Sequence, residues 1–279
     1  MDTGRYVRFC RQRTFELATY LVTVIANIPI QRANLGDPSF IPGLDEYQRE
    51  MLNETTAFRI RSKIDPGRTL ELSAYDPTGL ESLDTPGTSH VVTADHSGMA
   101  VSLTTTINLL FGSKLIVPST GVIMNNEMND FSVPGKINAF GYKPSPANFI
   151  RPGKRPLSSI SPTIVEHASN GTLSFVTGSA GGSRIVTATI QSLWHVLDMN
   201  RTPQEALAMP RFHDQLVPNN FVVEYSFDNR TVDYMKSLGH NVTLIPTALS
   251  SMSALRRKND GTFEVGRETR QAASGGYVV

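Results

Sequence analysis

The chain has 279 residues, of which 39% are hydrophobic and 18% are charged, and its formal net charge at pH 7 is +1. These values fit an ordinary globular protein of one large or two small domains, and they give no indication of nucleic acid or an anionic surface as a partner. The single cysteine, Cys10, excludes both a disulfide within this chain and a cysteine-based metal site.

The first 30 residues differ from the rest of the chain. Four arginines precede an apolar run, Leu17–Ile30, and a basic segment followed by an apolar one imitates a signal peptide or membrane anchor. The run contains Asn27 and Pro29, is too short for a comfortable membrane span, and is not followed by a small-residue cleavage site. We therefore expect residues 1–30 to be an atypical basic and apolar extension.

The sequence before residue 107 predicts a helix, a linker and then a β-hairpin. Charged and apolar residues at helical spacing first predict a surface helix over Gly43–Ser62, and a segment rich in Asp, Pro, Gly, Ser and Thr, Asp65–Thr85, predicts a linker. Two extended runs, His90–Thr93 and Met99–Thr106, then flank the polar turn Asp95–Gly98. This pattern is typical of a hairpin.

The rest of the chain alternates between strands and helices. Strands are expected at Leu115–Val117, Val122–Met124, Ile164–Val165, Ser174–Val176, Phe221–Tyr225 and Val242–Ile245. Helices are expected from a Ser183 cap to Leu197, after a capping box at Thr202, and over Val232–Leu238. Pro134–Pro156 is expected to be a loop, and Asn259–Gly261 a hairpin turn. The mixture predicts an α+β fold.

Gly87 and Thr88 precede the first hairpin strand, and their chemistry is specific. A threonine hydroxyl is a weak nucleophile without a base. If the chain is cut before Thr88, its new α-amine, which titrates near pH 8, can accept the proton of its own hydroxyl. Before the cut, the same hydroxyl could attack the Gly87 carbonyl, which no side chain obstructs. On spacing alone, however, a Gly-Thr pair before a strand is most often purely structural.

Four stretches resemble the small-subunit signatures of the γ-glutamyltranspeptidase family. They are TSHVVTADHSGMAVSLTTTIN, FGSKLIVPSTGVIMNNEMNDFS, RPGKRPLSSISPTIV and TGSAGGSRI, in the family's order and near its spacing. The resemblance covers roughly Arg32–Val279. It implies an N-terminal nucleophile hydrolase with the αββα architecture, in which two stacked sheets lie between helix layers.

The resemblance also implies a catalytic role for several of these residues. The chain would cleave itself at Gly87–Thr88, and Thr88 would then be the nucleophile. Thr106 would hydrogen-bond the nucleophile. Without the resemblance, it would be interpreted as an ordinary strand threonine. Gly181 and Gly182 would supply the oxyanion hole at a turn that opens a helix, where backbone N–H groups bind anions well.

Five further residues are implied to bind substrate. Asn108 would contact the glutamyl group, Glu127 and Asp130 would bind the α-ammonium of the donor, and Ser158 and Ser159 would hold its α-carboxylate. Two carboxylates three residues apart can converge on one ammonium. Without the resemblance, the same residues would be interpreted as a solvated acidic loop and ordinary turn serines.

Other catalytic signatures are missing from the sequence. The turn near Gly181 lacks the G-x-x-x-x-G-K-[ST] form of a phosphate loop, and the six histidines include no H-E-x-x-H. A nucleophile elbow, G-x-S-x-G, does not occur either. The resemblance likewise implies no metal or organic cofactor.

The resemblance implies a γ-glutamyltransferase or glutathione hydrolase. Glutathione and other γ-glutamyl compounds would acylate the nucleophile, and water or an amino-acid or dipeptide acceptor would resolve the γ-glutamyl ester. The partner in the processed heterodimer would be a large-subunit segment, with no nucleic acid involved. A related amidase acting on another acyl group is a further alternative, against which the paired carboxylates and serines argue.

Three regions are expected from this comparison. Residues 1–30 are the atypical extension, residues 31–87 are a remnant of the large subunit with a linker, and residues 88–279 are the small-subunit catalytic region. Gln31–Phe40 resembles a segment late in the large subunit, most of which, including an arginine for the α-carboxylate, precedes it in the family. We therefore expect an incomplete N-terminal side. The alternative function is a non-catalytic truncated fragment, and a divergent short protein is a third interpretation.

Five N-x-[ST] sequons suggest passage through the secretory pathway, with an extracellular, vacuolar or membrane-anchored destination. They begin at Asn53, Asn170, Asn200, Asn229 and Asn241. The number is only slightly above that expected by chance, so accidental sequons remain an equal interpretation.

Overall fold

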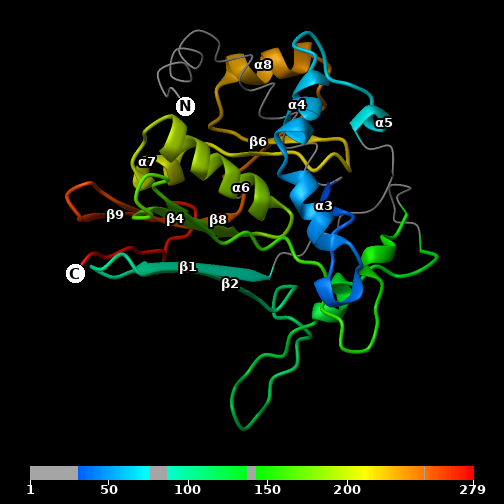
Figure 1. Ribbon diagram of the computed structural model, residues 1–279, viewed down its shortest axis with the longest axis horizontal. Coiled ribbons are helices and arrows are strands. Elements are labelled where there is room, and N and C mark those ends of the chain that lie inside the picture. The colour runs from blue at the N-terminus through cyan, green and yellow to red at the C-terminus, as the bar shows by residue number, and fades with distance from the viewer. Residues whose placement is uncertain (1–30, 76–86, 137–142, 248) are drawn as a thin grey trace.

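The computed structural model describes residues 31–75, 87–136, 143–247 and 249–279 (Figure 1). In these ranges the helices are α3 (Leu44–Met51), α4 (Glu54–Ser62), α5 (Leu72–Tyr75), α6 (Arg184–Leu193), α7 (Pro203–Ala208) and α8 (Asn229–Ser237), with 3-10 turns η1 (Pro38–Phe40), η2 (Glu127–Asp130) and η3 (Pro146–Asn148) and a π-helical turn η4 (Trp194–Asp198). The strands are β1 (Thr88–Ala94), β2 (Ala100–Thr106), β3 (Thr163–Glu166), β4 (Leu173–Ala180), β5 (Phe212–His213), β6 (Phe221–Glu224), β7 (Val242–Ile245), β8 (Ser251–Arg257) and β9 (Phe263–Gly266).

A four-stranded sheet of order β3-β4-β8-β9 forms the middle layer. Helices α6 and α7 lie on one face of this sheet, and the antiparallel ribbon β1–β2 runs along the other (Figure 1). Phe175 and Leu207 belong to the core on the helix side, while Val176 and Leu255 face Val92 of the ribbon. Strand β4 is therefore buried on both faces, which explains its nearly continuous run of apolar and small residues.

The ribbon has one covered face and one open face. Its residues alternate between half-buried and exposed along both strands, as expected for strands with one face on a core. On the outer face Val91, Val101 and Leu103 are 49%, 52% and 51% exposed. Within the described ranges no helix packs on that face, so the fourth layer of an αββα sandwich is missing there.

A smaller sheet of order β5-β6-β7 stands beside the main one and packs against α8. Phe221 of β6 and Val232 and Met235 of α8 form its core. Nowhere in the described part of the chain is a helix long and apolar enough to cross a bilayer.

Most of the expected elements are confirmed. The hairpin pairs Thr88 with Thr106 and Ala94 with Ala100. The capping box at Thr202 is present with both reciprocal hydrogen bonds, and β8 and β9 flank the Asn259–Gly261 turn. The expected extension over residues 1–30 lies outside the described residues, as do residues 76–85 of the expected linker and 137–142 of the expected loop.

Three expectations are wrong in the described ranges. The single helix expected over Gly43–Ser62 is two helices, because Asn53 caps a new one by accepting a hydrogen bond from the Thr55 N–H. The strands expected near Leu115 and Val122 reduce to one isolated bridge, Ile116 to Ile123, because neither run meets a third strand. Their side chains remain largely exposed.

Two further expectations fail because the residues concerned contact residues that are distant in sequence. Ser183 does not cap α6, since its hydroxyl donates to Gln215 Oε1 at 2.6 Å. The part of the expected linker that is described also has structure of its own. It contains the short helix α5, and Tyr75 at the end of this helix is buried against Leu216.

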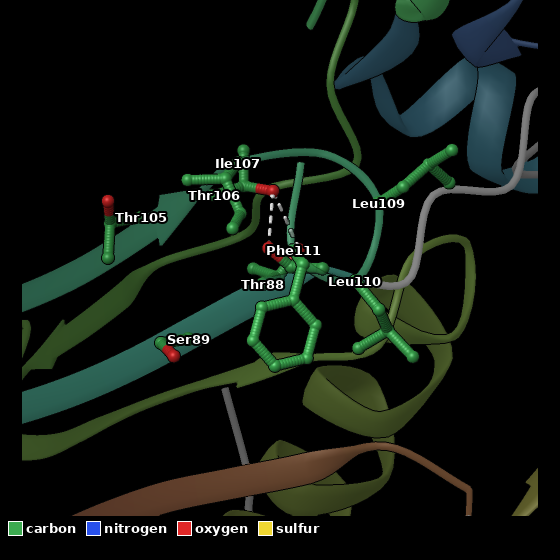
Figure 2. Close-up of a pocket in the computed structure, with 9 residues that line it drawn as sticks. Thr88, Ser89, Thr105, Thr106, Ile107, Leu109, Leu110 and Phe111 are labelled. Atoms are coloured by element: carbon green, nitrogen blue, oxygen red, sulfur yellow. Dashed lines mark hydrogen bonds between the residues drawn. The ribbon is translucent and has the colours of Figure 1, made fainter. Parts of the chain in front are cut away.

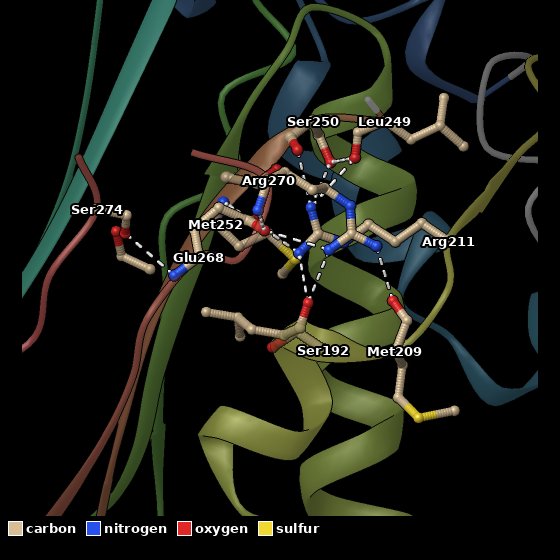
Figure 3. Close-up of polar contacts among 12 residues, drawn as sticks. Ser192, Met209, Arg211, Leu249, Ser250, Met252, Glu268, Arg270 and Ser274 are labelled. Carbon is tan, nitrogen blue, oxygen red and sulfur yellow. Dashed lines mark hydrogen bonds and ion pairs between the residues drawn. The ribbon is translucent and has the colours of Figure 1, made fainter. Parts of the chain in front are cut away.

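A buried ion cluster ties the end of the chain to the centre of the fold. Arg211 and Arg270 pair with Glu224 and Glu268, and all four side chains are at most 3% exposed. Figure 3 shows Arg211, Arg270 and Glu268 of this cluster. Arg211 and Glu268 meet at 2.8 Å, and Arg270 meets Glu268 at 3.2 Å and also pairs with Glu224. Because the cluster is neutral overall and each member is hydrogen-bonded, the two buried charges of each sign compensate one another.

Removing one member should therefore be costly. We predict that Glu268→Gln lowers the free energy of unfolding by about 3–5 kcal/mol, because it leaves a buried guanidinium without its counter-charge. The urea midpoint measures this loss. Glu264→Gln is the matched control, since Glu264 forms a more exposed pair with Arg256 at 2.6 Å and should cost about 1 kcal/mol or less. Equal losses in the two variants would contradict the assignment.

Candidate active site

The site begins where the first strand of the ribbon starts. Register places Thr88 directly opposite Thr106, and the two side chains face each other from neighbouring strands (Figure 2). The Thr88 hydroxyl donates to Thr106 Oγ1 at 3.2 Å, and the Asn108 N–H donates to the same oxygen at 2.9 Å. With both lone pairs occupied, the Thr106 hydroxyl has one free direction for its own proton, and it donates to the Gly87 carbonyl at 3.0 Å.

The Gly87 carbonyl thus carries two donors. Besides the Thr106 hydroxyl, the Ile107 N–H donates to it at 3.1 Å, while the Gly87 N–H donates to the Asn108 carbonyl. A Cβ at position 87 would lie 2.3 Å from the carbonyl oxygen of Leu109. Only glycine allows the backbone this close approach, which explains why position 87 carries no side chain.

A cavity of about 320 Å³ opens in front of these groups. Its lining joins the ends of both ribbon strands to the loop that follows: Gly87, Thr88, Ser89, Thr105, Thr106, Ile107, Leu109, Leu110 and Phe111 (Figure 2). Leu110 and Phe111 are 69% and 68% exposed, so one wall is apolar and open to solvent. A small ligand can therefore reach the Thr88 hydroxyl.

Strand β1 lies face to face with β4, and the contacts fix which ends meet. Val92 packs against the cluster that includes Val176, and the His90 ring lies on Gly178, where a Cβ would fall 2.3 Å from the ring. The two strands therefore run in opposite directions, and Thr88 at the start of β1 lies at the C-terminal end of β4. Burial lowers the pKa of His90 to about 4, so this ring is neutral at physiological pH.

Beyond that end of β4 lies the turn Gly181–Gly182, which leads into α6. Both glycines have positive φ, at 134° and 66°, a backbone conformation that other residues rarely adopt. Ser250 backs this turn, because a Cβ on Gly181 would lie 3.0 Å from the Ser250 Cα. Arg211 of the buried cluster holds Ser250 in turn, donating to its carbonyl at 2.8 Å (Figure 3). The turn expected to bind an oxyanion is thus supported by the ion cluster.

Asn108 connects the threonine pair to the expected substrate-binding residues. Its side chain is fully buried and donates to the Asn126 carbonyl at 2.9 Å, and the Asn126 side chain accepts from the Leu109 N–H at 3.1 Å. Asn108 has φ 71° and lies beyond the end of β2, so its position is set by this turn and not by the strand. Glu127 directly follows Asn126 in the chain.

Glu127 and Asp130 lie on η2, and Asp130 is 3% exposed. Burial, together with the hydrogen bond and charge of Glu127, raises the pKa of Asp130 to about 7, against the opposing positive charge of Arg32. Asn108 Oδ1, Glu127 Oε1 and Asp130 Oδ1 are buried and accept no hydrogen bond. These three acceptors without donors lie on two chain segments that the Asn108–Asn126 hydrogen bond joins, and they suit a cationic ligand such as an ammonium.

Ser158 and Ser159 lie on a separate loop; Ser159 is 6% exposed and Ser158 is exposed. The residue before them, Leu157, donates its N–H to Asn148 at 2.9 Å. The loop is also fixed from the N-terminal region. The Asp37 carboxylate accepts from the Arg155 backbone at 2.8 Å and from its guanidinium at 3.0 and 3.1 Å, which holds the pKa of Asp37 well below its usual range.

The structure therefore joins most of the expected residues into one connected group. Hydrogen bonds join Gly87, Thr88, Thr106 and Asn108, and through Asn126 this group continues to Glu127 and Asp130. The Gly181–Gly182 turn and the Ser158–Ser159 loop approach from other elements. The individual roles of these residues in binding and catalysis stay predictions.

Several positioning residues were not singled out from the sequence. Asn126, Asn148, the Asp37–Arg155 pair and Ser250 each fix a predicted site residue through a contact with a distant segment. Only Asn126 had a visible signal, since it falls within a polar run next to Glu127. Among the residues that the structure describes, no group of three or more His, Cys, Asp or Glu could hold a metal ion.

Comparison with known proteins gives a family match over most of the chain. A sequence model described as gamma-glutamyltranspeptidase matches residues 15–278. The chain is 57% identical over 249 residues to a glutathione hydrolase proenzyme of Arthroderma benhamiae, covering 89% of this chain and 42% of that protein. It is 44% identical over 281 residues to a glutathione hydrolase of Aspergillus flavus, covering 100% of this chain and 47% of that one. The chain thus spans less than half the length of these relatives.

Solved structures agree with the sequence comparison. A mutant gamma-glutamyltranspeptidase of Helicobacter pylori is 37% identical and superimposes with a TM-score of 0.60, covering 65% of this chain and 99% of that chain. A cephalosporin acylase of Bacillus halodurans, 19% identical, shares the fold with a TM-score of 0.67 over 92% of this chain and 48% of that one. These matches confirm the α+β, N-terminal nucleophile hydrolase fold expected from the sequence.

The carboxylate pair on η2 generates a prediction about stability. Because the pKa of Asp130 is raised to about 7 in the folded chain, its charged form opposes folding above that pH, and the penalty is relieved as the pH falls through about 7. We predict that Asp130→Asn is more stable than the wild type at about pH 8.5 and that this advantage shrinks toward about pH 5.

Thermal unfolding at a series of pH values measures the difference. Asp260→Asn is the control, since hydrogen bonds from Thr262 lower the pKa of Asp260 and leave it ionised over that whole range. An advantage of Asp130→Asn that does not change with pH would contradict the assigned pKa.

Proposed function

This chain belongs to the gamma-glutamyltranspeptidase family, and on that premise we propose that it is the catalytic part of a glutathione hydrolase or γ-glutamyltransferase. It cleaves itself between Gly87 and Thr88, and Thr88 then acts as the nucleophile. The observation that carries the proposal is the state of the Gly87 carbonyl, which accepts two hydrogen bonds beside the Thr88 hydroxyl.

We propose that self-cleavage starts from this geometry. Thr88 Oγ1 attacks the Gly87 carbonyl carbon, and the negative charge that develops on the carbonyl oxygen is stabilised by the Thr106 hydroxyl and the Ile107 N–H. The bond between the Gly87 carbon and the Thr88 nitrogen breaks, and the nitrogen takes up the hydroxyl proton as it becomes an amine. Water hydrolyses the resulting ester, which leaves a carboxylate on Gly87 and restores the Thr88 hydroxyl.

Turnover uses the same hydroxyl with a new base. The freed α-amine of Thr88, whose ordinary pKa is near 8, accepts the hydroxyl proton as Oγ1 attacks the γ-carbonyl carbon of the donor. The amide bond of the donor breaks, its nitrogen leaves with a proton, and a γ-glutamyl ester remains on Thr88. Water or an acceptor amine then attacks this ester. The Gly181–Gly182 turn supplies N–H groups to the oxyanion in both steps.

The unpaired acceptors favour an amino-acid-shaped acyl group. Glu127 and Asp130 offer a buried anionic site that an α-ammonium would satisfy, and Ser158 and Ser159 offer hydroxyl donors for an α-carboxylate. Glutathione and related γ-glutamyl compounds carry both groups. An acyl group without them would leave these buried carboxylate oxygens without a partner.

The exposed face of the ribbon supports a polypeptide partner for the active unit. Val91, Val101 and Leu103 form an apolar strip on that face, and its exposure matches the missing fourth layer. The relatives have more than half of their length outside the aligned region. We infer that the remainder of a large subunit covers this strip.

A second candidate is a non-catalytic form of the same fold, which the partial coverage of the relatives favours. It keeps the threonine pair and the turn but does not cleave itself. The two candidates differ in one observable, the appearance of a new N-terminus at Thr88.

Secretion is a separate proposal. The asparagines of all five sequons are exposed, as glycan attachment requires: Asn53, Asn170, Asn200, Asn229 and Asn241. Expression in a eukaryotic secretory host, followed by glycosidase treatment, tests it. A product with unchanged mobility would count against this route.

Self-cleavage is the direct test of the proposed function. We predict that the purified chain separates into two pieces meeting at Gly87 and Thr88 in denaturing electrophoresis and intact-mass measurement. Thr88→Ser should still be cut, because it keeps the hydroxyl, and Thr88→Ala should stay whole. A folded wild-type chain that remains uncut at 30.6 kDa would favour the non-catalytic form.

The role of Thr106 generates a second prediction. We predict that Thr106→Val slows self-cleavage by about 100- to 1,000-fold, because it removes one of the two donors to the Gly87 carbonyl, whereas Thr106→Ser largely retains the rate. Time courses of the intact mass measure both rates. Thr93→Val, an exposed threonine at the far end of β1, is the matched control. Equal rates in the two valine variants would contradict the role.

A further inference from the structure

A single buried amide joins the two halves of the proposed amino-acid site. The Asn148 side chain donates from Nδ2 to the Asp130 carbonyl at 2.7 Å and to Ser132 Oγ at 3.4 Å. Its Oδ1 accepts from the Leu157 N–H at 2.9 Å. Asp130 belongs to the proposed ammonium site, and Leu157 directly precedes the proposed carboxylate-binding serines.

Asn148 is itself firmly held. It ends η3 and is 3% exposed, and its backbone N–H donates to the Ser145 carbonyl at 3.0 Å. Its backbone carbonyl accepts from the Ser132 N–H at 3.1 Å. The Ser145 hydroxyl donates in turn to the Ala33 carbonyl at 2.6 Å, so the N-terminal region also supports this position. Because hydrogen bonds hold both its backbone and its side chain, Asn148 keeps a fixed distance between the two segments that it contacts.

We propose that Asn148 is the positioning residue that sets the separation between the ammonium-binding carboxylates and the carboxylate-binding serines. The site thereby selects acyl groups that carry both an ammonium and a carboxylate on one carbon. This inference rests on the proposed substrate class, and it adds the residue that enforces it. Asn148 acts through Asp130 and Leu157 and does not touch the donor itself.

The chemistry of the position explains the amide. Asparagine offers a donor and an acceptor on one planar group, and here each meets the opposite type. Aspartate has the same shape but would turn an oxygen toward the Asp130 carbonyl and Ser132 Oγ, so a repulsive contact would replace the donated bond to the carbonyl. Serine is too short to reach both Asp130 and Leu157. Either change removes the contact that fixes the distance between the two segments, while the substrate-binding residues themselves are not substituted.

Three small ligands separate spacing from general damage. L-Glutamate carries both α-groups, glutarate lacks the ammonium, and 4-aminobutyrate lacks the α-carboxylate. Calorimetric titration of the full chain with each measures binding without requiring catalysis. We expect Asn148→Asp and Asn148→Ser to weaken L-glutamate by about 10- to 100-fold, while the two single-group analogues bind as they do to the wild type.

Asn170→Asp is the matched control. Asn170 lies in the exposed turn between β3 and β4, and its Oδ1 accepts from Thr172, an interaction that a carboxylate keeps. This variant should bind all three ligands as the wild type does.

Two outcomes would overturn the proposal. One is a wild-type chain that binds L-glutamate no better than glutarate or 4-aminobutyrate. The other is a pair of Asn148 variants that weaken all three ligands equally or none of them. Self-cleavage is scored on the same samples, so an uncut chain whose Asn148 variants selectively lose L-glutamate would count against the proposed catalysis and still support the role of Asn148.

Discussion

The hydroxyl of Thr106 is the contact on which the site depends. It accepts from Thr88 and from the Asn108 N–H, and it donates to the Gly87 carbonyl. One side chain thus fixes the proposed nucleophile, the bond proposed to be cut and the start of the turn proposed to bind substrate. The contact requires the ribbon register that pairs Thr88 with Thr106, and that register depends on a glycine whose backbone alone fits beneath Leu109.

The remaining parts of the site are held by elements that are distant in sequence. The Gly181–Gly182 turn rests on Ser250, which the buried Arg211 fixes from the cluster near the C-terminus. On the opposite side, Asp37 of the N-terminal region clamps Arg155, three residues before Ser158. The proposed cut at Gly87 therefore leaves two pieces that share a site, because the N-terminal piece keeps its contacts with the loop that carries the serines.

The elements with local causes could be predicted from the sequence. Two extended runs around a polar turn predicted the hairpin and the end of its second strand at Thr106, and the capping box at Thr202 formed as expected. Predictions failed where a distant partner decided the outcome, as when Gln215 drew Ser183 away from capping α6. Asn148 had no sequence signal for the same reason, since its partners are set by tertiary packing. Family resemblance supplied the roles of the site residues, which no spacing pattern could have assigned.

We propose that Thr88 becomes a new N-terminus and carries the γ-glutamyl group. The most direct measurement is to incubate the chain with glutathione, quench it with acid, and determine by mass spectrometry which peptide carries an added γ-glutamyl group. We expect an ester on the peptide that begins at Thr88, absent from Thr88→Ala. A cut chain whose Thr88 peptide remains unmodified, or acylation at another residue, would contradict it.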